Sequence, residues 1–183
     1  QLGIEPVSHH AAPIIVITDA DALRENLPAV TEAVQAGATA VLLELPPGHY
    51  QLGSASITIR EAGMGPRHFV SRATGHPFVE GFEPNDFRFW YHESLGRVAP
   101  LLTTVLDAED WTPILLTGDG GWTKPWDYHP AAAEFADGEG LWRVCQITLP
   151  DCIEHNPVAR QFARRMVSPS PKGTYSEIVA ESI

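Results

Sequence analysis

Basic residues are scarce in this chain. Its 183 residues include 12 Lys and Arg against 23 Asp and Glu, which gives a formal net charge of −11 at pH 7. Nucleic-acid phosphates are bound by clustered Lys and Arg, and the one such cluster here is Arg160, Arg164 and Arg165. Arg160 and Arg164 share a helical face, which is typical of a solvated helix end. We therefore expect no nucleic-acid partner.

Long apolar runs are also absent. No stretch approaches the roughly 20 apolar residues of a membrane-spanning helix, so we expect no membrane partner. The first residues lack the basic and apolar regions of a signal peptide. Because the chain begins with Gln1 rather than Met, we expect a processed product or a piece of a longer protein, and the sequence leaves its compartment undetermined.

Cysteine is rare, and the motifs of several enzyme classes are missing. Cys145 and Cys152 are too few for a disulfide framework or a zinc set, so no metal is expected. Neither has the Gly-x-Cys-x-Gly setting that exposes a nucleophile on a sharp turn, and no Gly-x-Ser-x-Gly elbow occurs. Phosphate-cradling glycine motifs are absent too, so no cofactor is expected.

Cys152, Glu154 and His155 have the composition of a catalytic triad. They are almost adjacent in sequence, and neighbours this close seldom converge on one reacting atom. Cys145 falls within an apolar, strand-like run, which indicates a buried free thiol. We therefore predict that the domain is not an enzyme, with a diverged amidase or hydrolase that uses Cys152 as an alternative.

The first third of the chain has the pattern of a βαβ unit at 13–45. The run at 13–19 is apolar, as in a strand buried on both faces. Apolar residues then recur at helical spacing: Leu23, Leu27, Val30 and Val34. Asp21 suits the N-cap of this helix and Gly37 its C-terminal turn. A second buried strand follows at 39–45.

The remainder of the chain predicts further strands and a closing helix. Residues 131–136 and 141–149 suit an antiparallel hairpin around a turn at 137–140. Asn156 and Pro157 are favoured residues for a helix start. The predicted fold class is α/β, with an open, mostly parallel, flavodoxin-like sheet, helices on both faces and the antiparallel hairpin at one edge.

Two segments carry most of the aromatic residues. The run at 76–91 suits an irregular connection anchored by its rings, with His76 as a structural histidine and Asp86 as a turn former. The segment at 118–130 is predicted to be a long loop. Around it lie the candidate binding residues: Trp111, Trp122, Trp126, Asp127 and His129. Their rings and polar groups could contact a sugar, a partner or the core of the domain itself.

These residues carry a resemblance. The pattern His-Pro-x-x-x-Gly-Phe-x-x-x-Asp-Phe-x-x-Trp at 76–90 resembles class I glutamine amidotransferase-like accessory domains of glycoside hydrolases, chiefly family 2 β-galactosidase-type enzymes. The Gly-Glu-Gly turn at 138–140, the strand Val-Cys-Gln-Ile-Thr-Leu after it and Asn156-Pro157-Val158-Ala159 are similar to the same family. The resemblance implies the flavodoxin-like fold and an accessory domain beside a sugar-cleaving barrel.

We therefore expect a lead-in linker at 1–12, the amidotransferase-like domain at 13–167 and a linker or tail at 168–183. The expected role is a non-catalytic scaffold in a larger carbohydrate-active enzyme, packed on the catalytic domain of the same chain. A second copy of the chain and an oligosaccharide are the other candidate partners. The alternative function is a carbohydrate-binding module that uses the aromatic segment at 111–129.

Overall fold

The computed structural model describes residues 14–63, 70–121 and 124–169, with only the backbone described at 119–121 and 124–126. Its elements follow one another along the chain in the order β1 (Ile14–Ile17), α1 (Ala20–Gln35), β2 (Thr39–Leu43), β3 (Gly48–Leu52), β4 (Ala55–Glu61), β5 (Val70–Ser71), η2 (Pro77–Val79), β6 (Trp90–His92), β7 (Arg97–Ala99), β8 (Thr104–Asp107), β9 (Thr112–Gly121), β10 (Lys124–Asp137), β11 (Gly140–Cys145) and α2 (Pro157–Met166). Neither α-helix among these residues has the length and apolar character of a membrane span.

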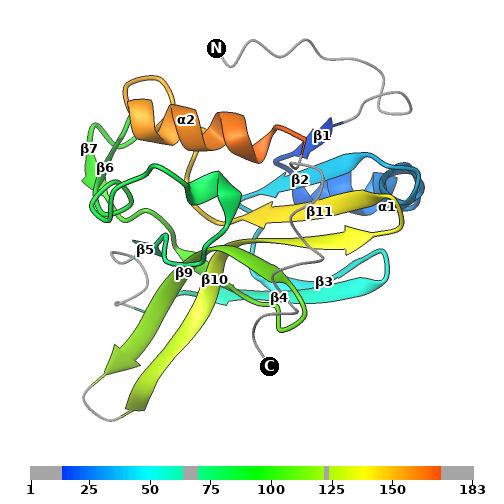
Figure 1. The fold of residues 1–183 in the computed structure, drawn as a ribbon, viewed down its shortest axis with the longest axis horizontal. Helices are drawn as coiled ribbons and strands as arrows, with labels where there is room; N and C mark the ends of the chain where they lie inside the picture. The colour runs from blue at the N-terminus through cyan, green and yellow to red at the C-terminus, as the bar shows by residue number, and fades with distance from the viewer. Residues whose placement is uncertain (1–13, 64–69, 122–123, 170–183) are drawn as a thin grey trace.

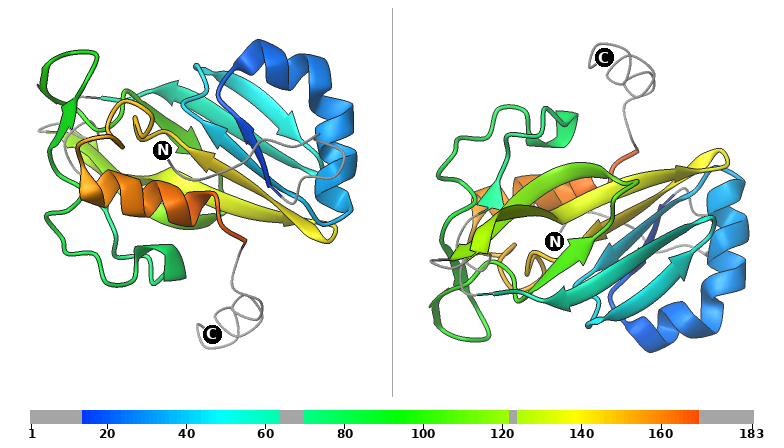
Figure 2. Two further views of the ribbon diagram at one scale, coloured as in Figure 1. Left: turned by 90° about the horizontal axis from the view of Figure 1, so that it is seen from above. Right: turned by 90° about the horizontal axis from the view of Figure 1, so that it is seen from below.

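A mixed six-stranded sheet, ordered β1-β2-β11-β10-β9-β5, forms the centre of the molecule. Strands β1, β2 and β11 are parallel, and the remaining pairs are antiparallel. One face packs against α2 and the aromatic segment at 76–90, and the other packs against α1 and a second, antiparallel sheet β3-β4-β8 (Figures 1 and 2). The chain thus buries two separate apolar clusters, one on each face of the sheet.

The prediction of a flavodoxin-like α/β fold is wrong. Strands dominate the described residues, and the sheets are mixed or antiparallel. After β2 a flavodoxin-like chain would add another crossover helix, but here β3 and β4 pair as an antiparallel hairpin from Gly48 to Glu61. The alternation of buried and exposed residues in β4 supports this pairing, because one face of a two-layer sheet must meet the core.

The predicted hairpin forms, but it is not at the edge of the sheet. Strand β11 lies between β2 and β10, so both arms of the hairpin are central. Trp142 and Val144 enter one apolar cluster, while Cys145 enters the other. Burial on both faces is typical of a central strand, and the alternation in the sequence did not show that.

The βαβ unit and the predicted start of α2 are confirmed, whereas the predicted cap of α1 is wrong. Strands β1 and β2 pair in parallel around α1. The helix is capped by Asp19, whose carboxylate accepts from the amide of Ala22 at 2.7 Å, rather than by Asp21. Gly37 has a φ of 112°, the left-handed geometry expected after a helix end. Asn156 accepts from the first amides of α2, as predicted.

The turn before β11 fastens the central sheet to α1. The amide of Glu139 donates to the carbonyl of Gln35, and that of Leu141 donates to the carbonyl of Ala38. A Cβ atom at Gly140 would lie 2.1 Å from the carbonyl oxygens of Val34 and Ala38. This close approach explains why glycine stands at position 140.

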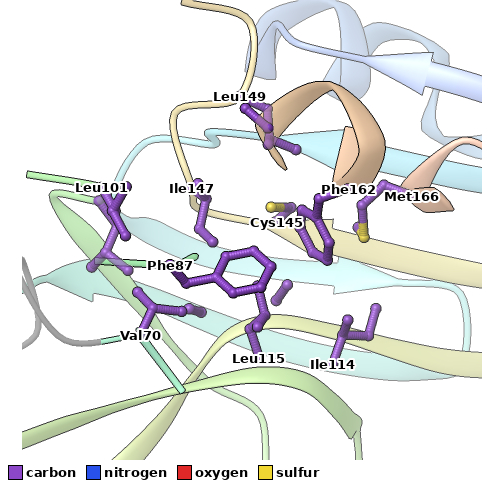
Figure 3. Close-up of a cluster of buried hydrophobic side chains, with 14 of the residues drawn as sticks. Val70, Phe87, Leu101, Ile114, Leu115, Cys145, Ile147, Leu149, Phe162 and Met166 are labelled. Atoms are coloured by element: carbon purple, nitrogen blue, oxygen red, sulfur yellow. The ribbon is translucent and has the colours of Figure 1, made fainter. Parts of the chain in front are cut away.

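Aromatic residues anchor the connection at 76–90, as predicted. Phe87 is fully buried, and its ring centroid lies 5.3 Å from that of Phe162 on α2. Figure 3 shows Phe87 between α2 and the sheet residues Leu115 and Val70. Asp86 accepts from the amide of Glu83 at 2.8 Å, which confirms its role as a turn former.

A buried ionic group ties this connection to the sheet. Arg143 of β11 donates from Nε to Glu134 of β10 at 2.6 Å, and both side chains are almost fully buried. His76 Nδ1 accepts from the amide of Phe78, so its proton is on Nε2, which lies 3.1 Å from Glu134. The Arg143 guanidinium also donates to the carbonyls of Met166 and Ser168 at the end of α2. We call Arg143, Glu134 and His76 the ionic trio.

The ionic trio makes stability depend on pH. Burial raises the pKa of Glu134, but the hydrogen bond from His76 and the Arg143 charge outweigh it and hold this pKa below its ordinary value. A lowered pKa stabilises the fold above the unfolded value of about 4.3, and this stabilisation is lost as pH falls through the folded value.

We predict that Glu134→Gln lowers the free energy of unfolding by about 3–5 kcal/mol at pH 7, because Arg143 loses its buried counter-charge. Urea denaturation of the unmodified chain and the variant, at pH 7 and at lower pH, measures this loss in the free energy of unfolding. The deficit should shrink at low pH, where Glu134 itself is protonated. Glu83→Gln removes the same charge at an exposed position and should change little. A loss of stability that is the same at both pH values would contradict the lowered pKa of Glu134.

Candidate functional site

The segment predicted as a loop at 118–130 is a long β-hairpin instead. Its described backbone belongs to β9 and β10, which project from the body of the molecule (Figure 1). Glycine and proline disfavour strands, so their presence in this segment led the sequence to predict a loop. The ladder nevertheless continues through Tyr128 opposite Gly118, with a register shift after Pro130.

A depression of ≈ 760 Å³ lies where this hairpin meets the second sheet. Three of the predicted binding residues line it: Trp111, Asp127 and His129. Arg60 of β4 and Asp107 of β8 line it as well, together with Tyr128. We call this hollow the first depression. The structure therefore brings together part of the site that the sequence suggested.

His129 is the centre of a hydrogen-bonded group in the first depression. Its Nδ1 lies 3.1 Å from Asp107 Oδ1, and its Nε2 lies 2.7 Å from Arg60 Nη2. Arg60 Nε in turn donates to both carboxylate oxygens of Asp107, at 3.2 and 3.1 Å. These contacts fix the imidazole: Nδ1 carries the proton and donates to Asp107, and Nε2 accepts from Arg60.

Asp127 is left with an accepting oxygen at the mouth of the depression. Its Oδ2 lies 3.3 Å from His129 Nε2, which carries no proton in this arrangement, so no hydrogen bond joins them. Its Oδ1 accepts from the amide of Tyr128 at 2.9 Å. The Asp127 side chain is 73% exposed, so Oδ2 can accept from a hydroxyl group of a ligand.

Trp111 belongs to the core rather than to an exposed platform. It is 4% exposed, and its ring centroid lies 5.6 Å from that of Phe135. Its indole nitrogen is buried, and among the described residues no hydrogen-bond partner reaches it. A buried donor without a partner is costly, and this atom has too little accessible surface to act as a contact for a ligand in the depression.

Trp122 lies outside the described residues. Trp126 falls within β10, but its side chain is also outside the described part of the chain. Both therefore remain predictions.

Sequence reasoning missed Arg60, Asp107 and Tyr128. Arg60 and Asp107 come together because β4 pairs with β8, with Arg60 opposite Val105 and Thr58 opposite Asp107. Nothing local in either segment specifies a pairing over that distance. Tyr128, at 70% exposure, could have been suspected from its place beside Asp127 and His129.

The cysteines lie in apolar surroundings. Cys145 ends β11 and is fully buried, and Figure 3 shows it among the apolar side chains of the cluster beside Phe162. Cys152 is 1% exposed in the same cluster. His155 is on the surface, where its Nε2 lies 3.2 Å from Glu93 Oε1. Cys152 and His155 are thus close in sequence but have different surroundings.

Among the described residues, no cluster of three or more His, Cys, Asp or Glu side chains could hold a metal ion.

No protein-family model matches the chain, and no curated protein matches it. Among solved structures, a cold-adapted β-galactosidase from Rahnella sp. R3 is similar to it, with a TM-score of 0.44 and 13% identity over 82% of this chain. The similar region covers 21% of that enzyme. At this TM-score the likeness carries no argument about fold or function, and the amidotransferase-like family is not identified.

Burial raises the pKa of both thiols to about 12. At pH 8 only about one thiol in 10⁴ would then be ionised. We predict that Ellman's reagent leaves both cysteines unmodified in the folded chain and modifies both in guanidinium chloride. Rapid modification of the folded chain that is lost in Cys152→Ser would contradict this and would support the amidase alternative.

Proposed function

We propose that this chain is a non-catalytic accessory domain of a larger carbohydrate-active enzyme, and that it packs on the catalytic region of that enzyme. The resemblance at 76–90 supports this role. The observation that carries it is an apolar surface on the β6–β7 hairpin, formed by Phe89, Tyr91, Leu95 and Val98, which are 63%, 44%, 53% and 56% exposed.

The β6–β7 hairpin has two different faces. Trp90 and Ala99 are opposite each other in the ladder, and both are buried. Tyr91 and Val98 are the next pair, and both are exposed. Solvated hairpins place polar residues on the outer face, so an outer face of aromatic and aliphatic residues favours a contact with another protein surface.

The hairpin is also held firmly enough to serve as a docking surface. Trp90 donates from its indole nitrogen to the carbonyl of Asp86 at 2.7 Å. The turn between the strands is fixed by Asp151, whose carboxylate accepts from the amide and the hydroxyl of Ser94, both at 2.8 Å. A rigid apolar surface loses little conformational entropy on binding, which favours association.

We predict that Val98→Asp, in the full-length protein that carries this chain, lowers the temperature at which glycosidase activity is lost by several degrees. In the isolated chain it should cost no more than about 1 kcal/mol, the range of strand propensities. Val16→Asp is the matched control, because Val16 is also an exposed strand valine, at 44%. Equal effects of the two variants on the full-length protein would contradict docking through β6–β7.

The alternative is a carbohydrate-binding module, and the first depression favours it. Neutral sugars need hydrogen-bond acceptors and donors beside an apolar surface. Asp127 Oδ2 supplies an acceptor, and the partly exposed Arg60 guanidinium supplies donors, on the walls of one hollow. Tyr128 supplies an exposed ring.

We predict for this alternative that galactosides change the intrinsic tryptophan fluorescence of the chain saturably. Asp127→Ala should weaken binding by about tenfold, the value of one hydrogen bond to a charged group. Asp21→Ala is the control, since Asp21 is a similarly exposed aspartate on α1. The absence of a saturable change with the unmodified chain would eliminate the module.

A further inference from the structure

We infer that a second hollow binds a small organic carboxylate with a ring-sized body. This second depression, of ≈ 660 Å³, lies on the hairpin β9–β10 where it meets β5 and the aromatic segment. It shares Leu116 and Tyr128 with the first depression. Its other walls include Val70, Arg72, Pro84 and Arg88. The inference does not depend on the proposed function.

The charge of the second depression is unusual for this chain. Acids outnumber bases by 23 to 12 over the whole sequence. Yet the charged residues that line this hollow are two arginines, Arg72 and Arg88, without an aspartate or glutamate among the described lining residues. In an acidic protein such a place favours an anion over a cation.

Arg72 gives the more direct sign of a ligand. Its Nε is buried, and no hydrogen-bond partner reaches this atom within the part of the chain that the structure describes. A buried cationic donor without a partner costs more than a neutral one, since its desolvation is not compensated. Arg72 as a whole is only half-buried, so a carboxylate in the hollow would pair with its guanidinium, whose planar fork matches the two oxygens of that group.

Arg88 lies at the other wall and is exposed. Its Nη1 donates to Asn85 Oδ1 at 3.3 Å, and its guanidinium lies 5.9 Å from the ring centroid of Phe89. Arg88 thus adds positive charge to the hollow. Together with Arg72 it favours a ligand with at least one negative charge.

The other residues that line the hollow indicate the shape and polarity of the rest of the ligand. Val70, Pro84 and Leu116 present aliphatic surface, and the Tyr128 ring is largely exposed. An inorganic anion would leave these apolar walls in water, whereas a ring would cover them. A sugar acid and an aromatic acid both have this combination of a carboxylate and a flat or partly apolar body.

Calorimetric titration of the whole chain tests the inference. The probes are D-glucuronate and benzoate, with glucuronamide and benzamide as their uncharged counterparts of nearly the same shape. We expect at least one acid to bind saturably, its amide to bind about tenfold more weakly or worse, and the difference to shrink as salt rises. Which acid binds distinguishes a sugar ligand from an aromatic one.

Two variants locate the binding. Arg72→Met removes the guanidinium and keeps an unbranched side chain, and it should abolish the preference for acid over amide. Arg24→Met is the control, since Arg24 is an exposed arginine on α1 that pairs with Asp21. A neutral sugar held in the first depression would still bind to Arg72→Met, which separates the two sites.

Four results would overturn the inference: no saturable binding of either acid, equal binding of acids and amides, unchanged acid binding in Arg72→Met, or inorganic sulfate binding as tightly as either acid. Thermal melting of each variant checks that it is folded. Should Arg72→Met fail to fold, the comparison of acid with amide on the unmodified chain still decides, because it needs no substitution.

Discussion

The ionic trio holds the parts of this molecule in register. Glu134 and Arg143 are on the two central strands of the main sheet, and His76 begins the aromatic connection. The Arg143 guanidinium also stacks on the Phe78 ring, 4.5 Å from its centroid. A buried charge pair tolerates little displacement, because each partner left alone would be uncompensated. The trio therefore fixes where the connection and the end of α2 lie on the sheet.

Further contacts continue from the trio to the surface. Arg165 of α2 donates to the carbonyls of Phe78 and Glu80 and lies over the Phe82 ring. Phe82 and Phe87 then pack against α2, and Trp90 leads into β6. The exposed face of the β6–β7 hairpin is the outer end of this series. The series thus ends at the apolar surface through which we propose that the domain docks.

Local signals in the sequence predicted local structure well. Asn156, Gly37, Asp86 and the buried Cys145 have the roles that their neighbours suggested, since caps, turns and apolar runs depend on a few adjacent residues. His76 also proved to be a hydrogen-bonded structural histidine.

The sheet order and the first depression could not be predicted in the same way. The pairing of β11 with β2 joins strands separated by about a hundred residues. Arg60 meets Asp107 across 47 residues and His129 across 69 residues of sequence. The hairpin β9–β10 was not predicted, because Gly118 and Pro130 disfavour strands locally. In the structure the ladder of backbone hydrogen bonds between the two strands outweighs this local preference.

Amide hydrogen exchange tests the central claim, docking through β6–β7, most directly. It would compare the isolated chain with the full-length protein that carries it, following the amides from Tyr91 to Val98. The account predicts that these amides exchange at least about tenfold more slowly in the full-length protein, while those of β3 at Gln51 and Leu52 exchange alike in both. Equal exchange of the β6–β7 amides in the two proteins would contradict it.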